Sequence, residues 1–243
     1  VLAVIPQQSR PLSEAGQASG QSEAYRGLRT SLALLAREGN LKSFATISGG
    51  VGEGKSTTLF NLAYVCAEQG SRVLIIDSDL RRPVQHKMVG LPNRTGLVNV
   101  LTGEMTPDAV VQESGVPNLW MMTSGRLRRG SLGIMNGPRL RAVLDALKDK
   151  FDMILMDSPP ILGVTDASII AGEVDGVLLV VRDLFIDYRL PARLDDELRI
   201  DVRLLETRRA SLRLMQSAHD LVSGRLLVQA EMRVAAIGAI DQR

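Results

Sequence analysis

Between residues 43 and 181, short apolar runs alternate with segments of helical spacing. Strands are predicted over 43–48, 72–77, 118–124, 151–157 and 176–181, and helices over 22–38, 55–69, 137–150 and 166–173. The runs, such as VLLVV at 177–181, are apolar at nearly every position, which is typical of strands buried on both faces. Strands of this kind separated by helices predict an α/β fold with a mostly parallel sheet.

The hydrophobic period changes after Arg182. Residues 184–190, 197–205, 211–219 and 225–236 are apolar at every other position, as strands with one buried face are. In the last run, one face is expected to carry Leu226, Val228, Ala230, Met232 and Val234. Ser223-Gly224 lies between two runs, where a hairpin turn is expected. The pattern predicts an antiparallel β-meander.

Three parts follow from these patterns. Residues 1–21, rich in Gln, Ser and Gly, are predicted to be a linker. Residues 22–182 form the predicted α/β domain, and residues 183–243 the β-rich tail.

The charge balance argues against a nucleic-acid partner, because 29 basic and 27 acidic residues leave a net charge of only +2. The densest basic patch, GRLRRG at 125–130, has no interleaved aromatic residue and is interpreted as a solvated loop. The single cysteine, Cys66, indicates a reducing compartment and a core position. No apolar run approaches the roughly 20 residues that span a bilayer.

The strongest chemical signal is SGGVGEGKST at 48–57, directly after a predicted strand and at the start of a predicted helix. It fits the P-loop pattern G-x-x-x-x-G-K-S, in which backbone N–H groups and a helix N-terminus surround a phosphate. Lys55 is expected to reach the β- and γ-phosphates, and Ser56 to offer its hydroxyl to Mg²⁺.

Two neighbouring apolar strands end in acidic residues. RVLIIDSD leaves Asp77 and Asp79 at the end of one strand, and FDMILMD leaves Asp157 at the end of another. Because the carboxyl ends of parallel strands meet at one edge of the sheet, these carboxylates are expected beside the P-loop. Such groups can hold Mg²⁺ or accept a proton from an attacking hydroxyl.

These motifs together resemble the bacterial tyrosine kinases, the cytoplasmic domains of polysaccharide co-polymerases that control capsule and exopolysaccharide export. SGGVGEGKST resembles their Walker A motif, VLIIDSDLRRP their Walker A′ motif and MILMDSPP their Walker B motif. SEAYRGLR is similar to the family's E-x-x-R-x-x-R element, and the resemblance covers roughly residues 1 to 182. It implies a P-loop NTPase fold and an ATP-dependent protein-tyrosine kinase.

The resemblance also implies ATP and Mg²⁺ as cofactors and assigns roles to residues. ATP-binding residues would be Gly50, Gly52, Glu53, Gly54, Lys55, Ser56 and Thr57. Catalytic residues would be Lys55, Asp77 and Asp79, with Asp77 as the base toward a tyrosine hydroxyl, and Mg²⁺ would be held by Ser56, Asp79 and Asp157.

A ring-like homo-oligomer is a further implication, in which Glu23, Arg26 and Arg29 of one subunit meet the next subunit's active site. The residues alone equally fit a solvated helix face, because an i,i+3 ion pair stabilises a helix by only about 0.2–0.5 kcal/mol. The family further implies a membrane co-polymerase or activator segment as partner and a cytoplasmic location at the inner face of the plasma membrane.

Two other functions remain open. The partitioning and division-site ATPases share this fold, but their loop carries a second lysine where this sequence has Gly50. A module that uses ATP for assembly, without phosphotransfer, also fits. The family's acceptor is a C-terminal tyrosine cluster, whereas this sequence has only Tyr25, Tyr64 and Tyr188.

The tail resembles the C-terminal half of a hotdog-fold acyl-CoA thioesterase, through PARLDDEL at 191–198 and the three long strands that follow. Such enzymes carry their catalytic acid and central helix in the other half, so the resemblance implies no thioesterase activity. His219-Asp220 beside the predicted hairpin is interpreted as exposed polarity. Half of such a fold is expected to leave a sheet edge and an apolar face uncovered.

Overall fold

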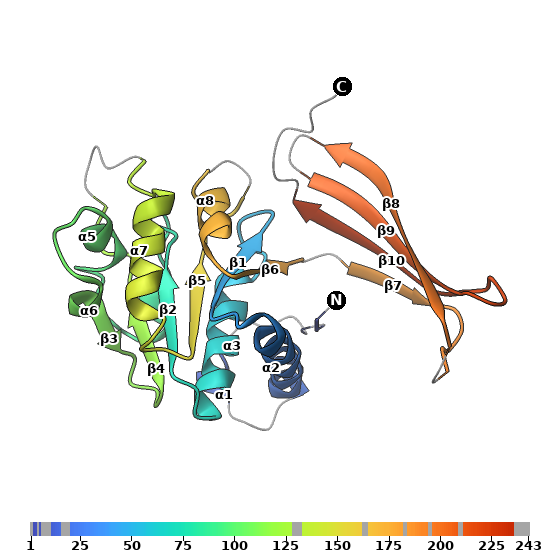
Figure 1. The fold of residues 1–243 in the computed structure, drawn as a ribbon, viewed down its shortest axis with the longest axis horizontal. Coiled ribbons are helices and arrows are strands. Elements are labelled where there is room, and N and C mark those ends of the chain that lie inside the picture. Colours follow the sequence, from blue (N-terminus) through green and yellow to red (C-terminus); the bar gives the residue numbers. More distant parts are fainter. Residues whose placement is uncertain are drawn as a thin grey trace. The chain divides into compact units, whose positions relative to one another are not determined.

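The computed structural model describes residues 2–3, 5, 11–15, 20–127, 133–161, 165–181, 184–193, 196–208 and 211–235 (Figure 1). The chain divides into two compact units. The first comprises Val1–Ile47, Gly54–Pro159 and Val164–Leu179, and the second Ser48–Glu53, Pro160–Gly163 and Val180–Arg243. The boundary predicted at Arg182 lies outside the described residues.

The first unit is built on a six-stranded sheet with strand order β3-β4-β2-β5-β1-β6. Its strands are β1 (Ser43–Ser48), β2 (Val73–Asp77), β3 (Val111–Glu113), β4 (Leu119–Met122), β5 (Met153–Asp157) and β6 (Gly176–Val180). β1 pairs in parallel with β5, β5 with β2, and β2 with β4, whereas β3 runs antiparallel to β4. The predicted α/β fold with a mostly parallel sheet is confirmed.

Helices cover both faces of this sheet (Figure 1). The longer ones are α2 (Gly20–Gly39), α3 (Lys55–Glu68), α7 (Gly137–Leu147) and α8 (Asp166–Glu173). Successive side chains of a strand point to opposite faces, so Val73 and Ile75 of β2 pack with α2 and α3, whereas Leu74 and Ile76 pack with α7 and α8. This two-sided burial explains why the strands are apolar at every position.

Several short elements between β2 and β4 were not predicted. They are α4 (Gln85–Met88), α5 (Leu97–Leu101), α6 (Pro107–Val110) and the antiparallel edge strand β3. Each spans five residues or fewer, which is too short for a hydrophobic period to be recognised.

The stretch predicted as a linker also differs from expectation. It contains the short helix α1 (Leu12–Ala15) and the start of α2. Leu12 is buried, and its backbone N–H donates to Asn61 Oδ1 at 2.9 Å. Part of this stretch is therefore packed into the first unit, where Leu12 joins the core cluster of α3, and Ala3 and Ile5 pack against that cluster.

The second unit contains a four-stranded antiparallel sheet with strand order β7-β10-β9-β8. Its strands are β7 (Leu184–Tyr188), β8 (Leu198–Arg208), β9 (Ser211–Asp220) and β10 (Leu226–Ala235). β8, β9 and β10 form the predicted meander, and β7 pairs with β10 instead of its neighbour in sequence. The predicted turn lies between β9 and β10, where Gly224 has a φ of +70°.

The edge strand β8 of this sheet exposes apolar side chains along one of its faces. On the edge strand β8, Leu198, Ile200, Val202 and Leu204 are 43%, 60%, 59% and 52% exposed. The prediction for β10 was wrong at Leu226: the register shifts between Leu226 and Val228, so that Leu226 pairs with His219 and Val228 with Ala218. This β-bulge moves Leu226 to the other face of the sheet.

Within the described residues, no helix combines the length and the apolar character that a membrane span requires.

Asp175, between α8 and β6, is hydrogen-bonded to the backbone at the start of β1 and is expected to stabilise the fold. Its Oδ2 accepts hydrogen bonds from Lys42 N (3.0 Å), Ser43 N (2.9 Å) and Ser43 Oγ (2.8 Å). Partial burial alone would raise the pKa of Asp175, but these bonds and Lys148 outweigh it and lower that pKa to about 2.

We expect Asp175→Asn to lower the free energy of unfolding by about 2 kcal/mol at pH 7, because the ionised acceptor is lost. A lowered pKa stabilises the fold above the unfolded-state value, so the difference should shrink as pH falls from about 4 toward 2. Urea denaturation of the wild type and the variant at pH 7 and at pH 3 measures the difference in unfolding free energy at each pH. Equal stabilities of the two proteins at pH 7 would contradict the prediction.

Candidate active site

The P-loop sequence joins β1 to α3, as predicted. Gly52 and Gly54 have φ values of +81° and +85°, in the left-handed region that glycine adopts without a steric penalty. Gly54 is the last residue before α3, and its carbonyl accepts the N–H of Thr58 at 2.8 Å. The loop therefore ends at the N-terminus of a 14-residue helix, where unpaired N–H groups favour an anion.

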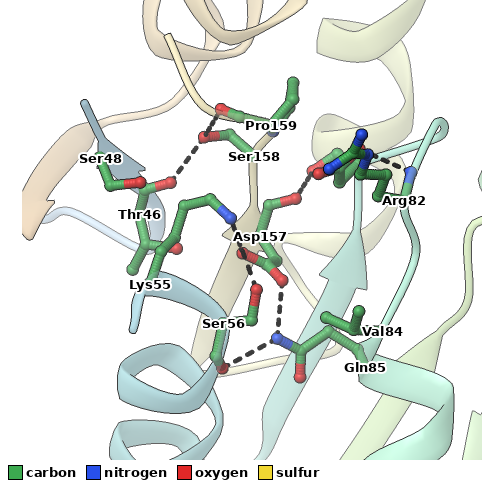
Figure 2. A network of polar contacts seen from close by, with 12 residues as sticks. Thr46, Ser48, Lys55, Ser56, Arg82, Val84, Gln85, Asp157, Ser158 and Pro159 are labelled. Atoms are coloured by element: carbon green, nitrogen blue, oxygen red, sulfur yellow. Dashed lines mark hydrogen bonds and ion pairs between the residues drawn. The ribbon is translucent and has the colours of Figure 1, made fainter. Parts of the chain in front are cut away.

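Lys55 and Asp157 form a buried ion pair at the carboxyl end of β5 (Figure 2). Lys55 Nζ lies 3.4 Å from Asp157 Oδ1, and the two side chains are 10% and 0% exposed. Lys55 Nζ is also 3.4 Å from Ser56 Oγ. Burial raises the pKa of Asp157, and the opposing effects of Lys55, Ser56 and Gln85 offset this in part.

Gln85 of α4 is a site residue that the sequence did not reveal. Its Nε2 donates to Asp157 Oδ2 at 2.8 Å and to the Ser56 carbonyl at 3.0 Å (Figure 2). Its side chain is buried, although neither the P-loop nor the acidic motifs include it. No local pattern marks this glutamine, because its partners lie 29 and 72 residues away.

Asp77 ends β2 directly beside Asp157, its register partner on β5. Asp77 Oδ2 accepts the backbone N–H groups of Val84 and Gln85, both at 3.0 Å, and the residue is fully buried. Burial and then the negative charge of Asp157 raise the pKa of Asp77 to about 7, although the two N–H bonds lower it. A carboxylate with a pKa near neutrality is suited to accept a proton.

Asp79 is 6% exposed and organises the turn after β2. Its Oδ1 accepts the backbone N–H groups of Arg82 (2.9 Å) and Arg81 (3.3 Å). Arg81 Nε in turn lies 4.0 Å from Asp166 Oδ2 at the start of α8. The three predicted acidic residues thus all lie at the carboxyl edge of β2 and β5.

The donor set fits a hydrated Mg²⁺ ion. No cluster of three acidic, His or Cys side chains in the described part of the chain could hold a metal by itself. Mg²⁺ usually takes only one or two carboxylates and keeps waters or substrate phosphates as its other ligands. Among the buried atoms of the described residues that lack a hydrogen-bond partner are Asp77 Oδ1 and Gln85 Oε1, and the water ligands of Mg²⁺ could donate to them.

Four further predicted site residues belong to the P-loop and the start of α3. Gly50, Gly52 and Glu53 belong to the second unit, where a Cβ at Gly50 would lie 3.2 Å from Glu53 Oε1. Thr57 lies in the first turn of α3 and is partly buried. Their roles toward a nucleotide remain predictions.

The element predicted for oligomerisation lies on α2. Glu23 and Arg26 form an ion pair with each other, and their side chains are 70% and 37% exposed. The charge of Arg29 influences Cys66. Burial raises the pKa of the Cys66 thiol to about 12, and the positive charge of Arg29 opposes this increase. Glu23 is therefore exposed, whereas Arg26 and Arg29 are both partly buried.

His219 and Asp220 do not pair with each other. His219 Nδ1 lies 3.1 Å from Asp201 Oδ2, whereas Asp220 accepts hydrogen bonds from Ser223 at the turn. The pair was interpreted as exposed polarity, but the His219 side chain is only 21% exposed and both residues are partly buried. Asp220 stabilises the turn through its bonds to Ser223.

The sheet, the glycine loop and the buried Lys55–Asp157 pair define the chain as a P-loop nucleotide-binding protein. A family described as AAA domain matches residues 41–183, and one described as Thioesterase superfamily matches residues 163–224. The second match agrees with the resemblance of the tail to part of a hotdog thioesterase.

Similar proteins of known class show which family of P-loop proteins the chain belongs to. Tyrosine-protein kinase YwqD of Bacillus subtilis is 38% identical over 160 residues, which are 66% of this chain and 68% of the relative. Putative tyrosine-protein kinase CapB of Staphylococcus aureus is 33% identical, with 66% and 70% covered. The kinase domain of Escherichia coli tyrosine kinase ETK is 29% identical, with a TM-score of 0.66 over 73% of this chain and 69% of that one. The chain belongs to the bacterial tyrosine kinases.

The division-site ATPases, the alternative class, are less similar to this chain in structure. The cell division ATPase MinD of Pyrococcus furiosus has a TM-score of 0.52, over 58% of this chain and 59% of that one, at 28% identity. The ATPase shares the P-loop fold with this chain. The kinases match over a larger share, which agrees with the D-x-D-x-R and D-S-P-P motifs and with Gly50 in place of the second lysine.

Proposed function

We propose that residues 22–182 transfer the γ-phosphoryl group of ATP to a tyrosine hydroxyl, in support of capsule or exopolysaccharide synthesis. The observation that carries this proposal is the buried cluster of Lys55, Asp157 and Asp77 at one edge of the sheet, beside the start of α3. A cation for phosphate and a carboxylate with a pKa of about 7 supply the two functions that the reaction needs. Residues 183–243 add no chemistry in this proposal.

Each residue has a distinct part in the proposed reaction. The phosphates are surrounded by backbone N–H groups of the loop from Gly50 to Gly54, which includes Gly52 and Glu53. The backbone N–H groups of Ser56 and Thr57 at the start of α3 complete this site. Lys55 Nζ offsets the negative charge that accumulates on the transferred group. Asp77 accepts the tyrosine proton as the oxygen–phosphorus bond forms and the bond to ADP breaks, so that phosphotyrosine, ADP and one proton on Asp77 result.

Mg²⁺, when bound, neutralises charge on the β- and γ-phosphate oxygens. Ser56, Asp79 and Asp157 would hold it, directly or through water. The contacts of Asp157 with Lys55 and Gln85, and the position of the Ser56 hydroxyl beside Lys55 Nζ, support this role.

Incubation of the full chain with labelled ATP, Mg²⁺ and a separate tyrosine-rich peptide tests the proposal. Label on peptide tyrosine supports phosphotransfer. ATP hydrolysis without phosphotyrosine would instead indicate a switch ATPase, and nucleotide binding without either reaction would indicate an assembly module. Both of these results would overturn the proposed activity.

The exposure of the three tyrosines predicts where the chain phosphorylates itself. Tyr25 is 1% exposed and hydrogen-bonded to Asn61 and Thr58, and Tyr64 lies within α3 and is bonded to Glu68. Tyr188, at the end of the edge strand β7, is 78% exposed. We expect Tyr188→Phe to remove most self-phosphorylation, measured by phosphopeptide mass spectrometry, and to leave phosphorylation of the added peptide unchanged. Undiminished label on the chain would contradict this prediction.

A homo-oligomer, ring-like in form, is proposed to assemble through Glu23, Arg26 and Arg29 of α2. A membrane co-polymerase or activator segment is the proposed partner, with the domain at the cytoplasmic face of the plasma membrane. No nucleic-acid partner is proposed.

We expect Arg26→Glu to shift the protein toward monomer, because it places two like charges on the exposed face of α2 and removes the cation offered to a neighbour. Light scattering after size-exclusion chromatography measures the mass. Arg37→Glu, in the last turn of the same helix, is the matched charge reversal and should leave the mass unchanged. Equal masses for wild type and Arg26→Glu would refute the assignment.

A further inference from the structure

The side chain of Gln85, which comes from α4, bonds both to the first turn of α3 and to Asp157. Its Nε2 donates to the Ser56 carbonyl (3.0 Å) and to Asp157 Oδ2 (2.8 Å), and its backbone N–H donates to Asp77 Oδ2 (3.0 Å). A single residue thus connects the P-loop helix and the ends of β2 and β5. These are the three segments that carry the proposed reaction.

The orientation of the Gln85 amide is fixed by its surroundings. Both partners of Nε2 are acceptors only, so a flipped amide would place Oε1 against two oxygens. Oε1 is buried and has no hydrogen-bond partner among the described residues. A buried acceptor without a partner costs free energy, and an apolar side chain of similar size would avoid that cost. Gln85 is therefore expected to do more than fill space.

The bond from Gln85 determines how Asp157 presents its carboxylate. Oδ2 is engaged by Nε2, so Oδ1 is turned toward Lys55 Nζ at 3.4 Å. Figure 2 shows Lys55, Ser56 and Gln85 around Asp157. Without Gln85, the carboxylate could rotate, because one of its two oxygens would lose its amide donor.

We propose that Gln85 is a positioning residue that holds Asp157 and the start of α3 in the arrangement that accepts Mg²⁺ with the nucleotide. This inference rests on the proposed function, since it concerns the same site. Removal of a partner that orients a metal-binding carboxylate typically costs 10- to 100-fold in metal affinity. The effect should therefore depend on Mg²⁺ and not on nucleotide contacts alone.

The test compares binding of a fluorescent ADP analogue with and without Mg²⁺, the latter in excess EDTA. We expect Gln85→Met, which keeps the length of the side chain but donates no hydrogen bond, to weaken binding about 10-fold in Mg²⁺ and by less than about 2-fold in EDTA. The Mg²⁺ concentration at half-saturation should rise about 10-fold, and high Mg²⁺ should restore binding. In the kinase assay, kcat should fall more than KM for ATP rises.

Two further variants keep the outcome unambiguous. If Gln85→Met does not fold, Gln85→Asn replaces it in the test, because asparagine keeps a polar side chain at this position. Its amide is too short to make the same bonds, so this variant should show the same dependence on Mg²⁺. Asn61→Leu removes another buried amide, which accepts the Leu12 N–H at 2.9 Å outside this cluster, and should change stability without altering the Mg²⁺ requirement.

Equal losses in Mg²⁺ and in EDTA, or no loss in either, would overturn the role of Gln85. A wild-type chain that binds no nucleotide with Mg²⁺ would instead overturn the proposed function on which the inference rests. The two failures are therefore distinguishable in one experiment.

Discussion

Lys55→Met should reduce phosphotransfer to a tyrosine peptide by at least about 100-fold, since it removes a preorganised cation from the transferred group. The same substitution should also destabilise the nucleotide-free fold. Lys55 Nζ is 3.4 Å from the fully buried Asp157, and a buried carboxylate deprived of its cation typically costs about 3 kcal/mol. Peptide phosphorylation and urea denaturation measure the two effects.

Lys150→Met is the matched control, because Lys150 pairs with Asp108 on the surface, where their side chains are 50% and 61% exposed. Surface ion pairs contribute at most about 1 kcal/mol, so both readouts should stay close to wild type. A Lys55→Met protein that retained phosphotransfer would refute the assigned role of Lys55. A protein that lost activity but kept its full stability would show that Asp157 does not depend on this cation.

The sheet and the acidic edge could be predicted because they depend on local signals. β1 and α8 have the bounds that the apolar runs indicated, and Asp77 and Asp157 are register partners, as strands with acidic ends at one edge require. The P-loop was recognisable since its glycines serve backbone conformations that few other residues adopt.

What escaped prediction depends on contacts between distant segments. Gln85 lies in a four-residue helix with no hydrophobic period, and its importance arises only when β2, α3 and β5 come together. In the second unit, β7 pairs with β10, because strand order is decided by tertiary pairing that alternation alone does not encode. The β-bulge that turns Leu226 away is likewise invisible in an alternating pattern.

Asp77→Asn should have the opposite effect on stability from Lys55→Met, although both substitutions should abolish phosphotransfer. Burial and the charge of Asp157 raise the pKa of Asp77 from 3.8 to about 7, so the ionised form destabilises the nucleotide-free fold. Its ionisation penalty is absent below about pH 4, increases between about 4 and 7, and is complete above 7. Asparagine keeps an acceptor for the N–H groups of Val84 and Gln85 and carries no charge.

The gain from Asp77→Asn should therefore reach about 2–4 kcal/mol at pH 8 and fade toward pH 4, at 1.36 kcal/mol per pKa unit. Urea denaturation across this range measures it. Asp175→Asn is the informative comparison, because the lowered pKa of Asp175 reverses the sign: that variant should lose stability at pH 8. If Asp77→Asn were destabilised at pH 8, Asp77 could not be a buried carboxylate held near neutrality. Its assignment as the base would then fail, since a carboxylate with an ordinary pKa would be too weak to take the tyrosine proton efficiently.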